Sequence, residues 1–227
     1  MVIDRHLYST IPATDFRRKC WVDFTLDGMT QENAINELKN YSNYPERVYK
    51  SGKENAKYGL GGLSLKFRNV AGKADVKYDA WCVSVPLMRI EEMKLIEAEA
   101  AGMQDEARGK VLLEAFAKTR DPQYAYGTHT DAYYNNSTSL FQNEVWWQRR
   151  VELWGEGFAT FDIKRLNKGI IRSYAGTNHL ENARWNTQEL PNWMVWTFVG
   201  TEADNNGGMT QNPNPVQPDT DSNPYPF

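Results

Sequence analysis

The sequence predicts a mainly α-helical protein with long irregular loops and a small β-hairpin. Apolar residues recur at intervals of three and four over 87–122 and again over 139–169, which is the period of a helix. Glycine, proline and asparagine divide most of the remainder into short pieces, and only 63–67 alternates apolar and polar residues as a half-buried strand does. The 227 residues are 41% hydrophobic, so the chain can bury a core as a single domain, 1–227.

Composition excludes several classes of protein. The formal net charge is -3 with both signs mixed, and no basic block alternates with aromatics, so we expect no nucleic-acid partner. No window approaches the roughly 18 apolar residues of a membrane span, and the N-terminus lacks the apolar core of a signal peptide. Taken alone, these features predict a cytoplasmic protein. Cys20 and Cys82 belong to no C-x-x-C pair, and we interpret them as buried free thiols, with a disulfide as the alternative.

The segment 1–86 is predicted to be loop-rich, with one short helix and a small hairpin. Thr30 is a suitable N-cap for a helix that runs to Asn40. The two strands of the hairpin are expected at 63–67 and at 80–85, where a short apolar run ends at a proline.

The segment 87–122 is predicted to be a helical hairpin that Pro122 ends. Two apolar stripes at helical spacing are expected to face the core. They are Met93, Ile96, Ala100 and Met103 in the first helix and Ala107, Val111 and Ala115, with Leu112 and Phe116 beside them, in the second. The small residues and the closing proline resemble one tetratricopeptide unit, a unit that normally buries its faces by stacking on others.

The segment 139–169 is the most specific of the sequence. Ser139 and Gln142 fit a capping box that starts a helix. Two glycines then predict a joint at 155–157, and a second helix is expected to end with Gly169 at the left-handed position. The buried stripe of the first helix is predicted to be Leu140, Trp147, Val151 and Trp154. The tail 201–227, rich in proline, asparagine and aspartate, is expected to be extended or disordered.

Metal, cofactor and nucleophilic chemistry have no support in the sequence. His6, His129 and His179 are far apart and lack metal-ligand spacing, so we interpret them as ordinary surface or loop histidines. The glycine-rich stretch 59–62 lacks the lysine of a phosphate loop, and no nucleophile elbow is present. We therefore predict no metal site and no cofactor.

Paired glutamates raise the alternative of a glycosidase, because glycoside hydrolysis needs two carboxylates at a suitable separation. Arginines close in sequence suit ion pairing, which lowers a carboxyl pKa and opposes general-acid catalysis. We therefore interpret this cluster as structural and predict no catalytic residue and no enzyme activity. The ion-pair motif consists of Arg149, Arg150, Glu152, Glu156, Asp162 and Arg165.

Aromatic residues in loops are the remaining candidates for a binding site. Tryptophan and tyrosine beside asparagine, glutamine and aspartate are typical of sugar-stacking surfaces, because a ring face and amide hydrogen bonds are then available together. The predicted ligand-binding residues are Tyr44, Tyr58, Trp185 and Trp193. A core role is the alternative for each, and Trp146, Trp147 and Trp154, at helical spacing, are assigned to the core.

Several segments resemble, in order, the SusD/RagB family. The family's arginine-led "AEA" helix is similar to 89–100, its charged motif to 149–157 and its aromatic-Asp-x-x-Arg close to 161–165. Its I-P-x-x-D-x-R element is similar to 11–17, and its closing Asn-Pro element to 212–214. Gln148 stands where the family pattern has glutamate, so one ion pair of the family is expected to be missing.

The resemblance implies a noncatalytic, lipid-anchored protein of the outer membrane, exposed at the cell surface, which replaces the cytoplasmic prediction. It implies capture of oligosaccharides or other nutrients for a SusC-like TonB-dependent transporter. Full members carry a lipidation signal and a helical N-terminal half, so we expect this chain to be a C-terminal half. Its only membrane attachment would then be a lipid anchor on the absent part. A helical protein–protein interaction module without its own ligand site is the alternative function.

Overall fold

The computed structural model describes residues 1–54, 59–67, 86–129, 138–213 and 224–227. Its described part is mainly helical and includes one two-stranded sheet, which confirms the predicted fold class. The α-helices are α1 (Arg5–Ser9), α2 (Gln31–Leu38), α3 (Pro45–Glu54), α4 (Ile90–Gln104), α5 (Glu106–Lys118), α6 (Leu140–Glu152), α7 (Ala159–Arg165) and α8 (Gly200–Asn205). The 3-10 helices are η1 (Phe16–Cys20), η2 (Phe24–Gly28), η5 (Glu181–Ala183) and η6 (Asn192–Met194), and the strands are β1 (Ile170–Ile171) and β2 (Asn186–Thr187).

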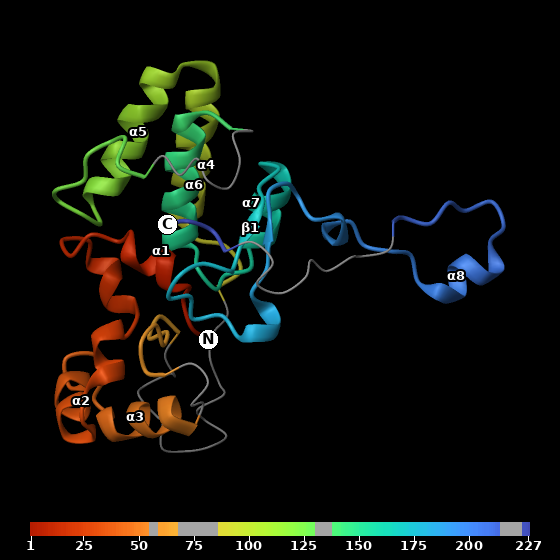
Figure 1. Ribbon diagram of the computed structural model, residues 1–227. Coiled ribbons are helices and arrows are strands. Elements are labelled where there is room, and N and C mark those ends of the chain that lie inside the picture. Colours follow the sequence, from red (N-terminus) through yellow and green to blue (C-terminus); the bar gives the residue numbers. More distant parts are fainter. Residues whose placement is uncertain (55–58, 68–85, 130–137, 214–223) are drawn as a thin grey trace.

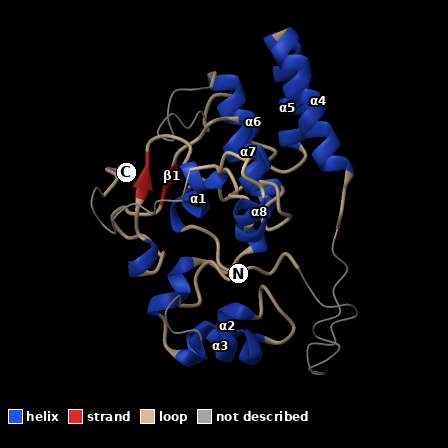
Figure 2. Cartoon of the chain, turned by 90° about the vertical axis from the view of Figure 1, so that its right-hand side faces the viewer, coloured by secondary structure: helices blue, strands red, loops and turns tan. Residues whose placement is uncertain are grey.

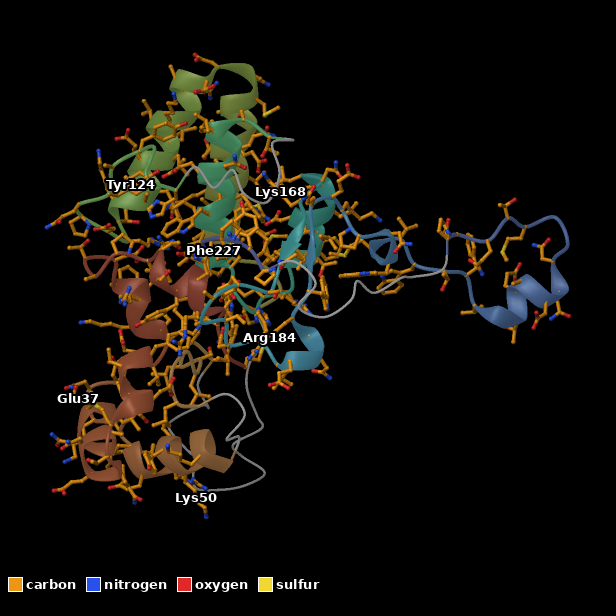
Figure 3. All side chains as sticks on the ribbon, in the orientation of Figure 1. Glu37, Lys50, Tyr124, Lys168, Arg184 and Phe227 are labelled. Atoms are coloured by element: carbon orange, nitrogen blue, oxygen red, sulfur yellow. The ribbon has the colours of Figure 1, made fainter. Side chains whose placement is uncertain are left out.

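Five of the helices form two groups, and the N-terminal segment from α1 through η1 and η2 runs between them (Figure 1). Helices α4, α5 and α6 lie side by side in the upper half of the view, and α2 and α3 pack together at the bottom. Figure 2, turned by 90°, shows the same separation. The chain leaves this body after η6 as an arm, residues 195–213, that carries α8, and the side chains of α8 stand clear of the other elements (Figure 3).

Helix α6 is the centre of the upper group. The capping box predicted at Ser139 and Gln142 is present. One side of the helix places Trp147 and Val151 against α1 and the Trp21 ring, and another places Phe141 and Val145 between α4 and α5. The predicted single stripe is wrong at Leu140, which is exposed, whereas Trp154 is half-buried and packs on Trp21 in the same cluster as Trp147 and Val151. A helix enclosed on several sides has no single apolar face, so the spacing of apolar residues does not tell which side chains are buried.

The predicted hairpin is confirmed as α4 and α5, but most residues of the two predicted stripes are not in the core, although Phe116 is buried and Leu112 half-buried. Met93 is half-buried, whereas Ile96, Ala100, Met103, Ala107, Val111 and Ala115 are exposed. The buried hairpin residues are Glu92, Leu95, Ala98, Ala101, Gly109, Leu113, Phe116 and Ala117. Small residues mark the buried face because the helices cross closely: a Cβ added to Gly109 would meet Gly102 Cα and the Phe141 ring.

The joint after α6 forms at the two predicted glycines, Gly155 (φ 75°) and Gly157 (φ 92°). Helix α7 ends differently from the prediction, because the left-handed residue is Asn167 (φ 51°) and not Gly169. The amide of Lys168 donates to Ile163 O and that of Asn167 to Lys164 O, which is the Schellman pattern. Asparagine tolerates the left-handed conformation, as glycine does, so both Asn167 and Gly169 were possible positions for the end of the helix.

The β structure only partly follows the prediction. In 63–67, Leu63 forms a single antiparallel bridge with Val2, and Ser64 one with Trp21, while the expected partner strand 80–85 lies outside the described residues. The two-stranded sheet instead pairs Ile170 with Thr187 and Ile171 with Asn186.

Local structure in the loop-rich parts was predicted unevenly. Thr30 caps α2 as predicted, whereas α3, which starts at Pro45, was not predicted. Cys20 is a half-buried free thiol, and Cys82 lies outside the described residues.

The tail differs from the expected extended chain in two places. It contains helix α8, and its last residues return to the body, where the Tyr225 amide donates to Ser173 O at 2.8 Å and Phe227 stacks on His6. Apolar and aromatic contacts therefore order a terminus that its composition predicted to be extended.

Replacing Gly109 by alanine should lower the free energy of unfolding by about 2 kcal/mol, because the added methyl group separates α4 from α5. Urea denaturation followed by circular dichroism measures the change. Gly207→Ala is the matched control, since a Cβ there meets nothing within 4 Å, and its effect should stay within about 0.5 kcal/mol. Equal effects of the two substitutions would contradict this account of the helix crossing.

Candidate functional site

The densest cluster of charge lies where η1, the start of α4 and the ends of α5 and α6 converge. Four carboxylates there meet four cationic side chains. The members of this charge network are Asp15, Arg17, Lys66, Arg89, Glu91, Arg120, Glu152 and Glu156.

Glu152, in the last turn of α6, is the centre of the charge network, with a side chain only 8% exposed. Its carboxylate accepts hydrogen bonds from Arg89 Nη1 at 2.6 Å, from Arg17 Nη1 at 3.2 Å and from Arg120 Nε at 3.2 Å. These three arginines come from three different segments. The carboxylate therefore ties η1, the start of α4 and the end of α5 to α6.

Glu156 forms the second part of the network, at the joint after α6. It accepts from Arg89 Nε at 2.8 Å and from Lys66 Nζ. The Lys66 ammonium also donates to the main-chain oxygens of Glu152 at 2.6 Å and Trp154 at 2.9 Å. Lys66 thus satisfies carbonyl groups that the helix end leaves without intrahelical partners.

The electrostatics of Glu152 oppose a catalytic role. Burial by itself would raise its pKa, but hydrogen bonds from Arg120 and Arg89 and the charge of Arg17 outweigh burial and lower the pKa to about 2. A general acid must still hold its proton near the working pH, so this carboxyl group is unsuited to protonate a leaving group. The network is suited instead to fixing the positions of the elements that it joins.

A smaller ion cluster holds α7 against α6 and α4. Asp162 accepts from Arg149 Nε at 2.8 Å and from Arg165 Nε at 2.8 Å. Arg165 also reaches Glu99 of α4, at 2.6 Å. The guanidinium of Arg150 lies 4.7 Å from the centre of the Trp146 ring.

The structure therefore corrects the partners expected for the ion-pair motif. Arg149 and Arg165 do pair with Asp162, which is close in sequence. Glu152 and Glu156 do not use the neighbouring arginines, because their partners are residues 32 to 135 positions away. The sequence signal for these partners is that Arg17 and Arg89 stand within the family-like motifs, at 11–17 and 89–100.

His129 and His179 lie in loops, as predicted, whereas His6 lies in α1, and all three have defined partners. The side chain of His129 is only 7% exposed, with its ring stacked 3.5 Å from that of Trp147, and its amide donates to Glu144, whose carboxylate also accepts from Tyr124 Oη. His6 stacks on Phe227, and His179 Nε2 lies 3.2 Å from Asp4. Among the residues that the structure describes, no three histidine, cysteine or acidic side chains are arranged to hold a metal ion.

The predicted ligand-binding aromatics do not gather at one place. Trp185 and Trp193 are in edge contact, with ring centres 5.6 Å apart. Trp185 is only 5% exposed and lies under the guanidinium of Arg172, so its ring is not an open stacking surface. Trp193 is half-buried, as is Tyr44, which directly precedes α3 at the far end of the molecule (Figure 1). Tyr58 lies outside the described residues.

An exposed tryptophan that the prediction did not select lies at the base of the arm. Trp196 is 85% exposed. Its main-chain oxygen accepts from Asn212 Nδ2 at 2.7 Å, and Gln211 exchanges two hydrogen bonds with the main chain of Phe198, so the two sides of the arm are fixed together. The available signal was the one apolar run, 192–199, in an otherwise polar segment.

Substituting Glu152 by glutamine should lower the free energy of unfolding by about 3 kcal/mol, because three arginines then lose their shared charge partner in a buried site. Chemical denaturation at neutral pH measures the loss. Glu114→Gln removes an exposed pair with Lys118 and should change stability by about 0.5 kcal/mol or less. A small effect at Glu152 would mean that the network does not hold the fold together.

The lowered pKa of Glu152 also predicts a dependence of stability on pH. Between the ordinary pKa of 4.5 and about 2, the unfolded chain binds the proton that the folded chain does not. The stabilisation is therefore complete above about pH 5 and is lost as the pH falls. Between pH 6 and pH 3 the wild type should lose about 2 kcal/mol more than Glu152→Gln. If the wild type and Glu152→Gln lost the same unfolding free energy over this pH range, folding would not lower the pKa of Glu152.

Comparison with known proteins identifies the family. The family model described as the SusD family matches residues 4–214, which is most of the chain and includes both ion clusters. Neither the curated proteins nor the solved structures contain a significant match. No helix in the described ranges has the length and apolar character needed to cross a membrane. Members of this family are generally noncatalytic proteins that bind nutrients such as glycans at the cell surface. The chain belongs to the SusD family.

Proposed function

We propose that this protein binds oligosaccharides or polysaccharides at the cell surface, without catalysis, and passes them to a SusC-like TonB-dependent transporter of the outer membrane. Family membership supports nutrient binding, and the ionised state of Glu152 supports the absence of general-acid catalysis. In this proposal a lipid anchor is the only attachment to the membrane.

The observation that carries the proposal is the open ring of Trp196. A sugar presents C–H groups on its ring faces and hydroxyl groups around its edge, so an aromatic ring bordered by amides can bind both. The nearby amide side chains are Asn212, which is bonded to the main chain of Trp196, and Gln211, which is bonded to that of Phe198. Phe198 and Val199 are exposed beside Trp196, and a run of exposed apolar residues is typical of an interaction site.

Charge near this tryptophan indicates which glycans to expect. The sequence after Arg184 contains no lysine or arginine, and Glu202 and Asp204 lie in α8. A negatively charged glycan would find no cation there to pair with, so we propose a neutral ligand. Trp193 remains proposed as a further contact of this site, and Trp185 is proposed to support it from beneath. Tyr44, at the far end of the molecule, remains proposed only as a separate ligand contact.

A helical protein–protein interaction module is the second candidate. The exposed apolar residues Ile96 and Met103 of α4 favour it, because monomeric proteins seldom leave a large contiguous apolar patch uncovered. The two candidates use different surfaces of the molecule, so one experiment does not decide both.

Replacing Trp196 by alanine should weaken binding of a neutral polysaccharide by about tenfold or more, because the stacking surface is lost. Affinity electrophoresis against neutral glucans, mannans and xylans, followed by calorimetry with oligosaccharides, measures this effect. Phe16→Ala, which removes an exposed ring on η1, is the control and should leave affinity unchanged.

Two results would overturn this assignment. The first is that the wild type binds no member of the panel. The second is that a glycan binds to Trp196→Ala and to Trp193→Ala as tightly as to the wild type. Recovery of a transporter by the purified protein while every glycan fails would favour the interaction module instead.

A further inference from the structure

The far end of the arm carries the one Asn-Gly dipeptide of the sequence, Asn206-Gly207. Asn206 is the C-cap of α8, and Gly207 and Gly208 continue the chain beyond it. All three residues are exposed. Because the side chains of α8 stand clear of the other elements (Figure 3), water reaches this turn from several sides.

Asparagine is a chemically labile residue, and before glycine it can react with its own main chain. The nitrogen of the following residue attacks the side-chain carbon Cγ and closes a five-membered succinimide ring, while its proton passes to the side-chain amide, which leaves as ammonia. Water then opens the ring at either carbonyl carbon and gives aspartate or isoaspartate. Glycine favours ring closure because it has no Cβ to obstruct the attack and because its backbone reaches conformations closed to other residues.

The bonds that hold the Asn206 side chain lie in water. Its Nδ2 donates to Glu202 Oε1 at 2.9 Å, and its Oδ1 accepts from the amide of Gly208 at 3.2 Å. Water competes for these exposed groups, so the net contribution of both bonds to stability is small. A Cβ added to Gly207 meets nothing within 4 Å, so packing does not hold the turn closed either. Local opening, which frees Cγ for attack, therefore costs little free energy.

The Asp-Gly dipeptide at 27–28 is the contrasting case within the same chain. An aspartate forms the same ring by loss of water. Asp27 Oδ1, however, accepts from the amides of Leu60 at 2.6 Å and Gly61 at 2.8 Å, in partly buried surroundings. Reaction with Gly28 would leave these two amides without an acceptor, which is costly. The fold thus holds Asp27 in place and leaves Asn206 free to react.

We propose that Asn206 is a site of spontaneous deamidation in the folded protein, with water as the only co-reactant. The product is a carboxylate at the C-terminal end of α8, four residues after Glu202. The helix dipole disfavours negative charge at this end, and two carboxylates at this spacing repel each other. The donor that Glu202 now uses is lost as well. Deamidation therefore loosens the last turn of α8, whether or not the arm binds a glycan.

Mass spectrometry of the purified full chain, incubated at mildly alkaline pH and sampled over several days, tests the proposal. The peptide that contains Asn206 should gain one mass unit, because OH replaces NH2, and should divide into an aspartate and an isoaspartate form. Peptides with other asparagines should keep their mass, and the peptide that contains Asp27 should form no isoaspartate. A sample digested without incubation shows how much of the change arises during digestion.

Variants assign the reaction to this dipeptide. Asn206→Gln and Gly207→Ala should both lose the mass gain, the first because its ring would be larger and the second because a methyl group obstructs the attack. The alanine fits the fold, since its Cβ meets nothing within 4 Å. Gly200→Ala, at the other end of α8 and equally free of contacts, is the matched control and should react like the wild type.

Limited proteolysis measures the effect on α8. A glutamate-specific protease should cut after Glu202 faster in Asn206→Asp and in the incubated wild type than in the fresh wild type, because the last turn of the helix is loosened. Equal cutting of all three would contradict that consequence.

Three outcomes would overturn the proposed site. They are an unchanged mass at Asn206, a mass gain that survives Gly207→Ala, and a reaction that is fast in urea but far slower in the folded chain. The last result would mean that the fold protects Asn206.

Discussion

Burying the carboxylate of Glu152 is the constraint on which the arrangement of this protein depends. An ionised carboxylate removed from water is unstable unless cations and hydrogen bonds replace its solvent. Arg17, Arg89 and Arg120 supply them, and each is fixed to a different segment of the chain. The loop that follows α1, the helical hairpin and α6 therefore have to meet at one point. Removing one member would leave the other charges buried without compensation, so the elements are coupled through this point.

The joint after α6 extends the same constraint to α7. The glycines at 155 and 157 allow the chain to reverse, and Lys66 and Arg89 bind Glu156 between them. Asp162 then holds Arg149 and Arg165, which brings α7 near α4. This placement leaves a groove between α4 and α7, and it leaves Arg149 with one donor unused. The geometry that stabilises the core thus also produces an exposed apolar surface.

Stability and the proposed recognition surface lie in different parts of this molecule. Glu152 and its partner Arg17, with the rings of Trp146 and Trp147, are buried and serve the fold, while the rest of the charge network is largely half-buried. The open surfaces include the arm, with Trp196 at its base, and the apolar groove between α4 and α7. An arm fixed by amide side chains can vary in its contacts without disturbing the core, which suits a family whose members bind nutrients.

The sequence alone determined the features that depend on neighbouring residues. It indicated the family, the hairpin, the capping box at Ser139 and the glycine joint, because helical period, capping and left-handed conformations are local properties. Only the tertiary structure decided which face of each helix is buried. A period of 3.6 residues fixes the spacing of apolar side chains but not what packs on them, so the stripe of Ile96 and Met103 is an open groove wall instead of core. The partners of Glu152 were equally beyond local reasoning, since an ion pair between residues 135 positions apart leaves no trace in the spacing of either one.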